Sequence, residues 1–215
     1  MNKVYGVALS PYVRKVLFAL EYKEADYHLE MTLPFQTPAA YRDIHPLRKI
    51  PGFTDEYLSL PESGIICQYL DEKYPHNSYY PRDFRDRARA LWFENYADTR
   101  LAEVLLPFWV QRKVMPLLFG RAGEQRLIAR AEKQLPSVAR YLEQELGSAG
   151  FLFADGLMLC DVAVAGMFKQ AAYAGHQLCP VSYPRLTAYL QRVWHTPAFT
   201  KRLQDEKAMM AMFDM

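Results

Sequence analysis

Cysteine is scarce in this sequence, and long apolar runs are absent. The 215 residues include three cysteines, Cys67, Cys160 and Cys179, and none of them has CxxC spacing. An odd number of scattered cysteines argues against a disulfide framework and favours a reducing compartment, so we expect a cytoplasmic protein. No stretch approaches the roughly 18 apolar residues of a membrane helix, and the apolar run near the N-terminus is too short for a signal peptide. We therefore expect no membrane partner.

An excess of charge of one sign is also lacking. Lys and Arg number 26 against 24 Asp and Glu, the formal net charge is +2, and no dense basic run occurs. We therefore expect no nucleic-acid partner. The five histidines show neither HExxH nor metal spacing with the cysteines, so we expect no metal. The P-loop, G-x-G-x-x-G and G-x-S-x-G motifs are absent as well.

What is present at the front of the chain is a strand, a helix and a second strand. Residues 3–9 and 27–31 have the pattern of short strands. Between them, Ser10 is a favourable N-cap and Pro11 suits the first helical position. From these residues alone, Ser10 is either a plain helix cap or a hydroxyl available for chemistry.

The stretch 49–63 predicts a hairpin that leads into a helix. Ile50-Pro51 opens a short extended run, a turn and a second short run follow, and Glu62-Ser63 begins the helix. A helix N-terminus carries unpaired N–H groups and a partial positive charge, so it suits a carboxylate. Parallel pairing at the front and an antiparallel hairpin together predict a mixed sheet.

The rest of the chain reads as helices only. We expect a domain of residues 1–75, a linker at 76–83 and an all-helical domain at 84–215. Two prolines, Pro107 and Pro116, should kink or divide the first long helical segment. The predicted helical segments are 84–119, 123–146, 161–176, 184–194 and 197–209.

Six motifs in order resemble the cytosolic glutathione transferase superfamily, in particular its serine-type, bacterial-like members. The residues that carry the resemblance are Tyr5-Gly-x-x-x-Ser10-Pro11, Lys49-Ile50-Pro51, Glu62-Ser63, Arg87-Ala88, Gly156-Leu-Met-Leu-Cys-Asp161, and Tyr183-Pro184 with Thr196-Pro197. One departure is that Met158 stands where the family usually has Ser or Thr, so Asp161 is left to cap the helix start. The resemblance implies an α/β thioredoxin-like N-terminal domain with a mixed four-stranded sheet and an all-α C-terminal domain.

The same resemblance implies a glutathione transferase that acts as a homodimer. Glutathione would be the co-substrate, and its thiolate would be conjugated to a small hydrophobic electrophile. Ser10 would be the catalytic residue, since its hydroxyl would stabilise the thiolate. The implied glutathione-binding residues are Lys49, Ile50, Pro51 in a cis peptide bond, Glu62 and Ser63.

Two further expectations concern the second substrate and the alternatives. We expect the pocket for the electrophile to be lined by Tyr12, Phe108, Trp109 and Arg112. One alternative function is a glutathione-dependent isomerase or dehalogenase. The other is a non-catalytic binding protein on the same fold, of the stringent starvation protein A type.

Overall fold

The computed structural model describes residues 1–147, 150–153 and 156–213, and they form two compact units. The first unit comprises Met1–Tyr79 together with Pro197–Met210, and the second comprises Tyr80–Thr196 with the chain end from Ala211. The division between Tyr79 and Tyr80 falls within the predicted linker. The last helix, however, is grouped with the first unit, whereas the predicted domain 84–215 includes it.

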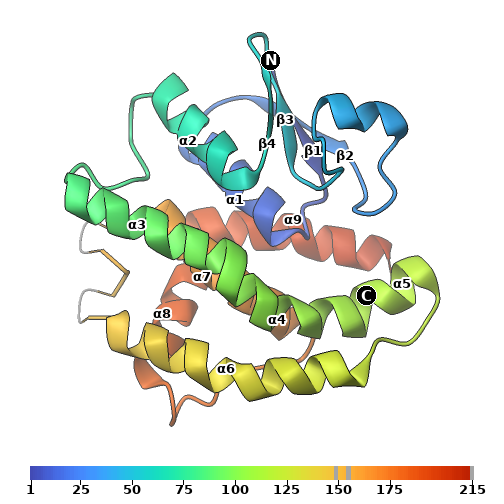
Figure 1. Cartoon of the computed structure of the whole chain (residues 1–215). Helices are drawn as coiled ribbons and strands as arrows, with labels where there is room; N and C mark the ends of the chain where they lie inside the picture. Colours follow the sequence, from blue (N-terminus) through green and yellow to red (C-terminus); the bar gives the residue numbers. More distant parts are fainter. Residues whose placement is uncertain (148–149, 154–155, 214–215) are drawn as a thin grey trace. The chain divides into compact units, whose positions relative to one another are not determined.

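The first unit is built on a four-stranded sheet in the order β2-β1-β3-β4 (Figure 1). β1 pairs parallel with β2 and antiparallel with β3, and β3 pairs antiparallel with β4. The sheet is therefore mixed, and the predicted fold class is confirmed. The strands are β1 Asn2–Gly6, β2 Tyr27–Met31, β3 Gly52–Thr54 and β4 Ser59–Pro61.

Two helices, α1 (Pro11–Tyr22) and α2 (Ser63–Lys73), lie side by side in this unit (Figure 1). A 3₁₀ helix, η1 (Ala39–Asp43), lies in the connection between β2 and β3. α1 begins directly after Ser10 with proline at its first position, which is the start that the sequence predicts.

α9 (Pro197–Met212) is held in the first unit by buried ion pairs with α1. The Arg14 guanidinium donates to both carboxylate oxygens of Glu206 at 2.5 and 3.0 Å, and both side chains are almost fully buried. Arg202 reaches the Glu21 carboxylate at 2.5 Å. Ion pairs between distant residues leave no periodic signal in the sequence, and the purely helical pattern after the linker predicts the last helix in the helical domain.

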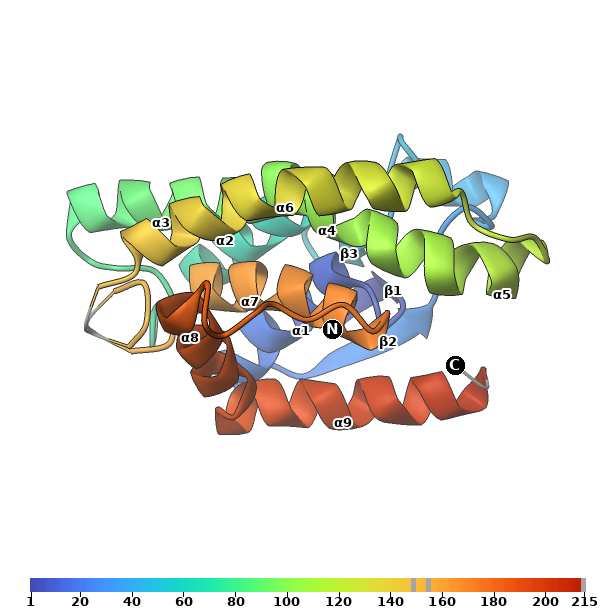
Figure 2. The same cartoon turned by 90° about the horizontal axis from the view of Figure 1, so that it is seen from below.

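The second unit is all-helical, and α7 is its most buried helix. α7 packs against α3, α4 and α8, and α6 runs beside α4 (Figure 2). At the start of α7 the Asp161 carboxylate accepts the Met158 N–H at 2.9 Å, so Asp161 caps the helix as expected. The helices are α3 Phe84–Tyr96, α4 Ala102–Trp109, α5 Met115–Phe119, α6 Gln125–Glu145, α7 Leu159–Tyr173 and α8 Pro184–Trp194.

The first long helical segment is not divided at its prolines. α3, α4 and α5 are joined by two π-helical segments, η2 (Ala97–Leu101) and η3 (Val110–Val114). Pro107 lies inside α4, just before η3. A wider π turn re-routes backbone hydrogen bonds near a residue that lacks an N–H, so the chain stays helical. Across the described residues, no helix combines the length and apolar character needed to cross a membrane.

Candidate functional site

Three connections of the first unit, β1–α1, η1–β3 and β4–α2, meet where the ends of these strands lie side by side. We call this place the site edge of the sheet. In the strand register, Tyr5 lies opposite Gly52, and Gly52 lies opposite Pro61. The end of β1, the start of β3 and the end of β4 are therefore neighbours. The segments that follow or precede them, 7–10, 50–51 and 62–63, carry the predicted residues Ser10, Ile50, Pro51, Glu62 and Ser63.

Close packing at Gly6 joins two of these segments. A Cβ atom at Gly6 would lie 2.5 Å from Val13 Cγ2, in the first turn of α1, and 3.5 Å from Ile50 Cβ. A contact of 2.5 Å is too short for any side chain. The absence of a side chain at residue 6 therefore lets the start of α1 and Ile50 approach the same backbone position.

Ser10 is the N-cap of α1. Its backbone is extended, and its Oγ accepts the Val13 N–H at 3.4 Å. A serine hydroxyl that accepts this bond can still donate its own proton. The first turn of α1 has no acidic residue, so no side chain there offsets the partial positive charge of the helix N-terminus. The cap and the proposed chemistry of Ser10 are thus compatible.

The Ile50–Pro51 peptide bond is cis, which confirms the prediction for Pro51. Pro51 is buried, Ile50 is partly exposed, and the Lys49 side chain is exposed to solvent. The Lys49 carbonyl accepts the Tyr41 hydroxyl at 2.9 Å.

Glu62 and Ser63 form the start of α2. Glu62 is the N-cap with φ = 67°, an uncommon backbone conformation for a residue with a side chain, and its side chain is exposed. Ser63 is only 3% exposed. Backbone conformations of this kind are often found at binding sites, where the surrounding structure holds them in place.

The predicted second-substrate residues are divided between the two units. Tyr12 is a partly exposed residue of α1 in the first unit. In the second unit, the buried Phe108 ring stacks on His176 with centroids 4.1 Å apart, and Arg112 donates to the Ala174 carbonyl at 2.9 Å. Trp109 is buried and packs near Tyr173. Their role in a pocket stays a prediction.

Two residues near Lys49 were missed by the sequence analysis, namely Tyr41 and His45. Both are buried, their rings stack with centroids 6.3 Å apart, and His45 Nδ1 has no hydrogen-bond partner among the described residues. Burial lowers the pKa of His45, the nearby Glu62 carboxylate opposes that shift, and Lys49 adds to it. The described part of the chain contains no cluster of three His, Cys, Asp or Glu side chains suited to a metal ion.

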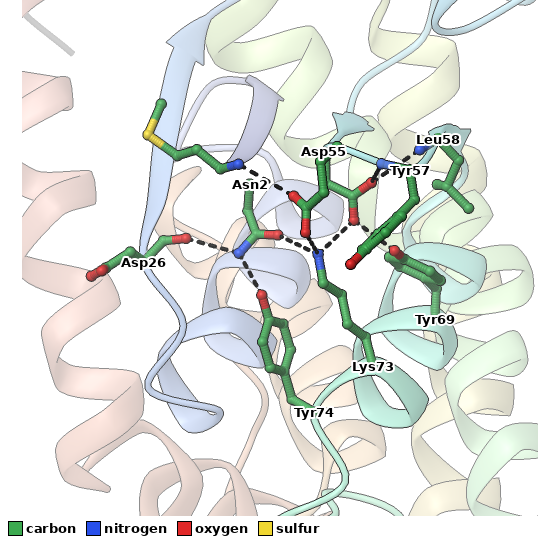
Figure 3. Close-up of polar contacts among 10 residues, drawn as sticks. Asn2, Asp26, Asp55, Tyr57, Leu58, Tyr69, Lys73 and Tyr74 are labelled. Atoms are coloured by element: carbon green, nitrogen blue, oxygen red, sulfur yellow. Dashed lines mark hydrogen bonds and ion pairs between the residues drawn. The ribbon is translucent and has the colours of Figure 1, made fainter.

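A polar network occupies the turn at the other end of the β3–β4 hairpin (Figure 3). Asp55 accepts the N–H groups of Tyr57 and Leu58, and its second oxygen accepts Tyr69 at 2.6 Å and Lys73 at 2.8 Å. Burial by itself would raise the pKa of Asp55, but these hydrogen bonds, above all that from Lys73, lower it to about 2. The network fixes the hairpin turn and lies apart from the segments at the site edge.

Comparison with protein families gives two matches. Residues 4–78 match the glutathione S-transferase N-terminal domain, and residues 125–192 match the glutathione S-transferase C-terminal domain. These two regions together cover most of the chain.

Individual relatives agree with the family matches. Mouse glutathione S-transferase theta-3 is 26% identical over 167 residues, covering 77% of this chain and 69% of the relative. A wheat glutathione S-transferase is 25% identical over 202 residues, covering 93% and 92%. Human glutathione S-transferase T1-1 in its apo form has a TM-score of 0.86 at 23% identity, with 100% of this chain and 92% of that chain covered. At that identity, the structural match establishes the fold alone.

Proposed function

This chain is a member of the glutathione S-transferase superfamily, and we propose that it conjugates the thiolate of glutathione to a small hydrophobic electrophile. The observation that carries the proposal is the meeting, at one sheet edge, of the Ser10 cap, the cis Ile50–Pro51 peptide and the start of α2. This edge would offer a hydroxyl donor, the backbone of Ile50 and two helix N-termini to one ligand.

The tripeptide would bind along this edge through charges at both ends. The exposed Lys49 ammonium would bind the glycyl carboxylate. The backbone of Ile50 would pair with the central peptide of glutathione, as a neighbouring strand does. The N–H groups at the start of α2 and the Ser63 hydroxyl would bind the γ-glutamyl carboxylate, and Glu62 would accept its ammonium.

Ser10 would act on the protonation of the ligand's thiol. A free thiol has a pKa of about 8.5. A hydrogen bond to a charged group contributes about 1.5–3 kcal/mol, and a helix N-terminus adds about 0.3–1 kcal/mol. Since one pKa unit corresponds to about 1.4 kcal/mol, these two effects would lower the pKa of the thiol by about one to three units. The ionised fraction of bound glutathione at neutral pH would then be several times that of free glutathione, and nearly complete for the larger shift.

The reaction itself needs no covalent bond to the protein. The thiolate sulfur donates an electron pair to the electrophilic carbon, and the S–C bond forms. With an aryl chloride, the C–Cl bond then breaks and chloride leaves with the bonding electrons. The proton of the thiol has already passed to solvent, so atoms and charges balance.

Replacement of the Ser10 hydroxyl tests the proposal. We expect Ser10→Ala to lower kcat/KM for 1-chloro-2,4-dinitrobenzene by about 10- to 100-fold, which corresponds to a loss of about 1.4–2.7 kcal/mol. In a titration of the thiolate absorbance of bound glutathione, the pKa of the thiol should rise by about one unit or more.

A matched control separates this effect from the loss of a helix cap. Asp83 is the N-cap of α3 and accepts the N–H groups of Arg85 and Asp86. Asp83→Ala should lower stability by about 0.5–2 kcal/mol, as Ser10→Ala does, but leave the thiol pKa unchanged. Wild-type activity in Ser10→Ala would show that another group activates the thiol. Failure of the wild-type protein to bind immobilised glutathione would reject the proposal altogether.

We also propose a cytoplasmic homodimer, the usual assembly of this superfamily. Each unit exposes large apolar side chains that a second copy could cover, including Tyr57 and Ile65 in the first unit and Phe84 and Trp92 in the second. Light scattering coupled to size-exclusion chromatography should give twice the 25.0 kDa mass of the chain. A mass of one chain at micromolar concentration would reject the dimer.

A further inference from the structure

We propose that Tyr41 is a positioning residue for glutathione, because its hydroxyl bonds the Lys49 carbonyl before Pro51 and packs against Gly52 after it. The inference rests on the proposed function, in which Lys49 and Ile50 bind the ligand. Tyr41 itself would not touch the ligand, since it is only 5% exposed.

The phenolic oxygen of Tyr41 contacts the backbone before and after the proline. It donates to the Lys49 carbonyl at 2.9 Å, and it packs closely against Gly52. The approach is close, because a Cβ atom at Gly52 would lie 2.6 Å from the oxygen and 3.2 Å from Cζ. One side chain on η1 thus links residues 49 and 52 across the Ile50–Pro51 peptide.

The ring that carries this hydroxyl is itself fixed. It packs against Tyr5 of β1 with centroids 5.8 Å apart, and against His45 on the turn that follows η1. Burial, and to a smaller extent the nearby Tyr5, raise the pKa of Tyr41 to about 12, although the nearby Gly52 backbone opposes this. The hydroxyl therefore stays protonated, and a donor, at any ordinary pH.

A fixed backbone at Lys49 and Ile50 matters because both would contact the tripeptide. A flexible segment would have to become ordered when glutathione binds, and that ordering would weaken binding. Groups held in the productive geometry by a supporting shell avoid this cost. Ser10 lies on another element, so the loss of the Tyr41 hydroxyl should affect binding rather than chemistry.

The test is Tyr41→Phe, which removes the hydroxyl and keeps the ring. Isothermal titration should show a Kd for glutathione about three to ten times higher than in the wild-type protein. The kcat at saturating glutathione should be unchanged. In ligand-free protein, hydrogen exchange of the Lys49 and Ile50 amides should become faster, and this measurement does not depend on glutathione binding.

Two further variants make the test specific. Tyr5→Phe is the matched control, since the Tyr5 hydroxyl faces Thr54 Oγ1 at 3.5 Å instead of the Lys49 carbonyl. It should leave both the Kd and the amide exchange unchanged. p-Aminophenylalanine at residue 41 retains the ring and a donor, so it should fold and restore most of the wild-type Kd.

The outcomes are distinct. Wild-type Kd and exchange in Tyr41→Phe would overturn the inference, and so would equal changes in Tyr41→Phe and Tyr5→Phe. If the wild-type protein does not bind glutathione at all, the proposed function is rejected. Faster amide exchange in Tyr41→Phe would even then show that the Tyr41 hydroxyl holds the Lys49–Ile50 backbone in place.

Discussion

Among single residues, Asp161 carries the clearest electrostatic consequence. Its carboxylate accepts the N–H groups of Leu152 and Met158 and the Tyr189 hydroxyl, at 2.9–3.0 Å. Burial nevertheless raises its pKa from 3.8 to about 6, because the hydrogen bonds offset only part of the lost hydration. The folded protein therefore binds a proton at pH values where the unfolded chain has released it.

The sign of the pH dependence follows from this difference. The contribution of Asp161 to stability is complete below pH 3.8 and is lost as the pH rises through about 6, by about 3 kcal/mol in total. Asp161→Asn should remove this dependence. In urea unfolding between pH 4 and 7, the stability of the wild-type protein relative to the variant should therefore fall by that amount.

Asp55→Asn is the control for this prediction. The pKa of Asp55 is lowered to about 2, so its contribution is present above pH 3.8 and is lost only as the pH falls toward 2. Between pH 4 and 7 the difference between wild type and Asp55→Asn should be nearly constant. A constant difference for Asp161→Asn as well would contradict the raised pKa.

Single residues also show what the sequence reveals and what it does not. The Ser10 cap could be predicted from the local Ser-Pro pattern, whereas the cis bond at Pro51 could be predicted only from the family resemblance. Tyr41 could not be, because its importance comes from a contact with Lys49 and Gly52 that depends on how η1 packs. A lone tyrosine in a five-residue 3₁₀ helix has no periodicity to mark it.

At the scale of elements, a buried lysine ties the end of α1 to the chain that leaves α2. The Lys23 ammonium pairs with the Asp71 carboxylate at 2.8 Å and donates to the carbonyls of Tyr74 and His76 at 2.6 and 2.9 Å. Both charged side chains are almost fully buried. The ammonium thereby donates hydrogen bonds to carbonyl groups at and just after the C-terminus of α2, where the helix dipole favours a cation.

Loss of this ammonium should be costly. Lys23→Met would leave the Asp71 carboxylate buried without its cation, and we expect stability to fall by about 3–5 kcal/mol in chemical denaturation. Lys133→Met, at an exposed position of α6, is the matched control and should change stability by less than about 0.5 kcal/mol. Equal effects of the two substitutions would contradict the role assigned to Lys23.

Element boundaries were predictable where local chemistry sets them. The starts of α1, α8 and α9 follow from prolines, and β2 follows from its apolar pattern. The prolines in the segment predict a kink or a break, and the structure shows no break, since α3, α4 and α5 are joined through π-helical segments. The positions of these π-helical segments have no local signal in the sequence.

For the whole molecule, the buried pair of Arg14 and Glu206 is one of the ion pairs that join the last helix to α1 in the first unit. Arg14 also lies over the Phe199 ring at 5.7 Å, so α9 surrounds this guanidinium with both charge and an aromatic face. The unit to which a helix belongs depends on contacts between residues far apart in the sequence. The periodicity of a helix says nothing about such contacts. The fold class could thus be predicted from sequence, but the membership of α9 could not.

Three variants test the energetics of this pair. Arg14→Met and Glu206→Met should each lower the free energy of unfolding by about 3–5 kcal/mol, since each leaves one buried charge without its counterpart. The double variant should be more stable than either single variant, because neither charge of this pair is left buried without the other. Additive losses in the double variant, measured by urea unfolding, would show that the two side chains act independently.

The bond between Arg14 and Glu206 spans 192 residues of sequence, and this has a consequence for biosynthesis. A ribosome makes β1 and α1 early, but it makes α9 only after every helix of the second unit. The buried pair that joins α1 to α9 therefore cannot form until the second unit has been synthesised. Domains usually complete their folding in the order of synthesis, N-terminal first. In this protein the first unit to emerge must wait for the second before it can close this ion pair.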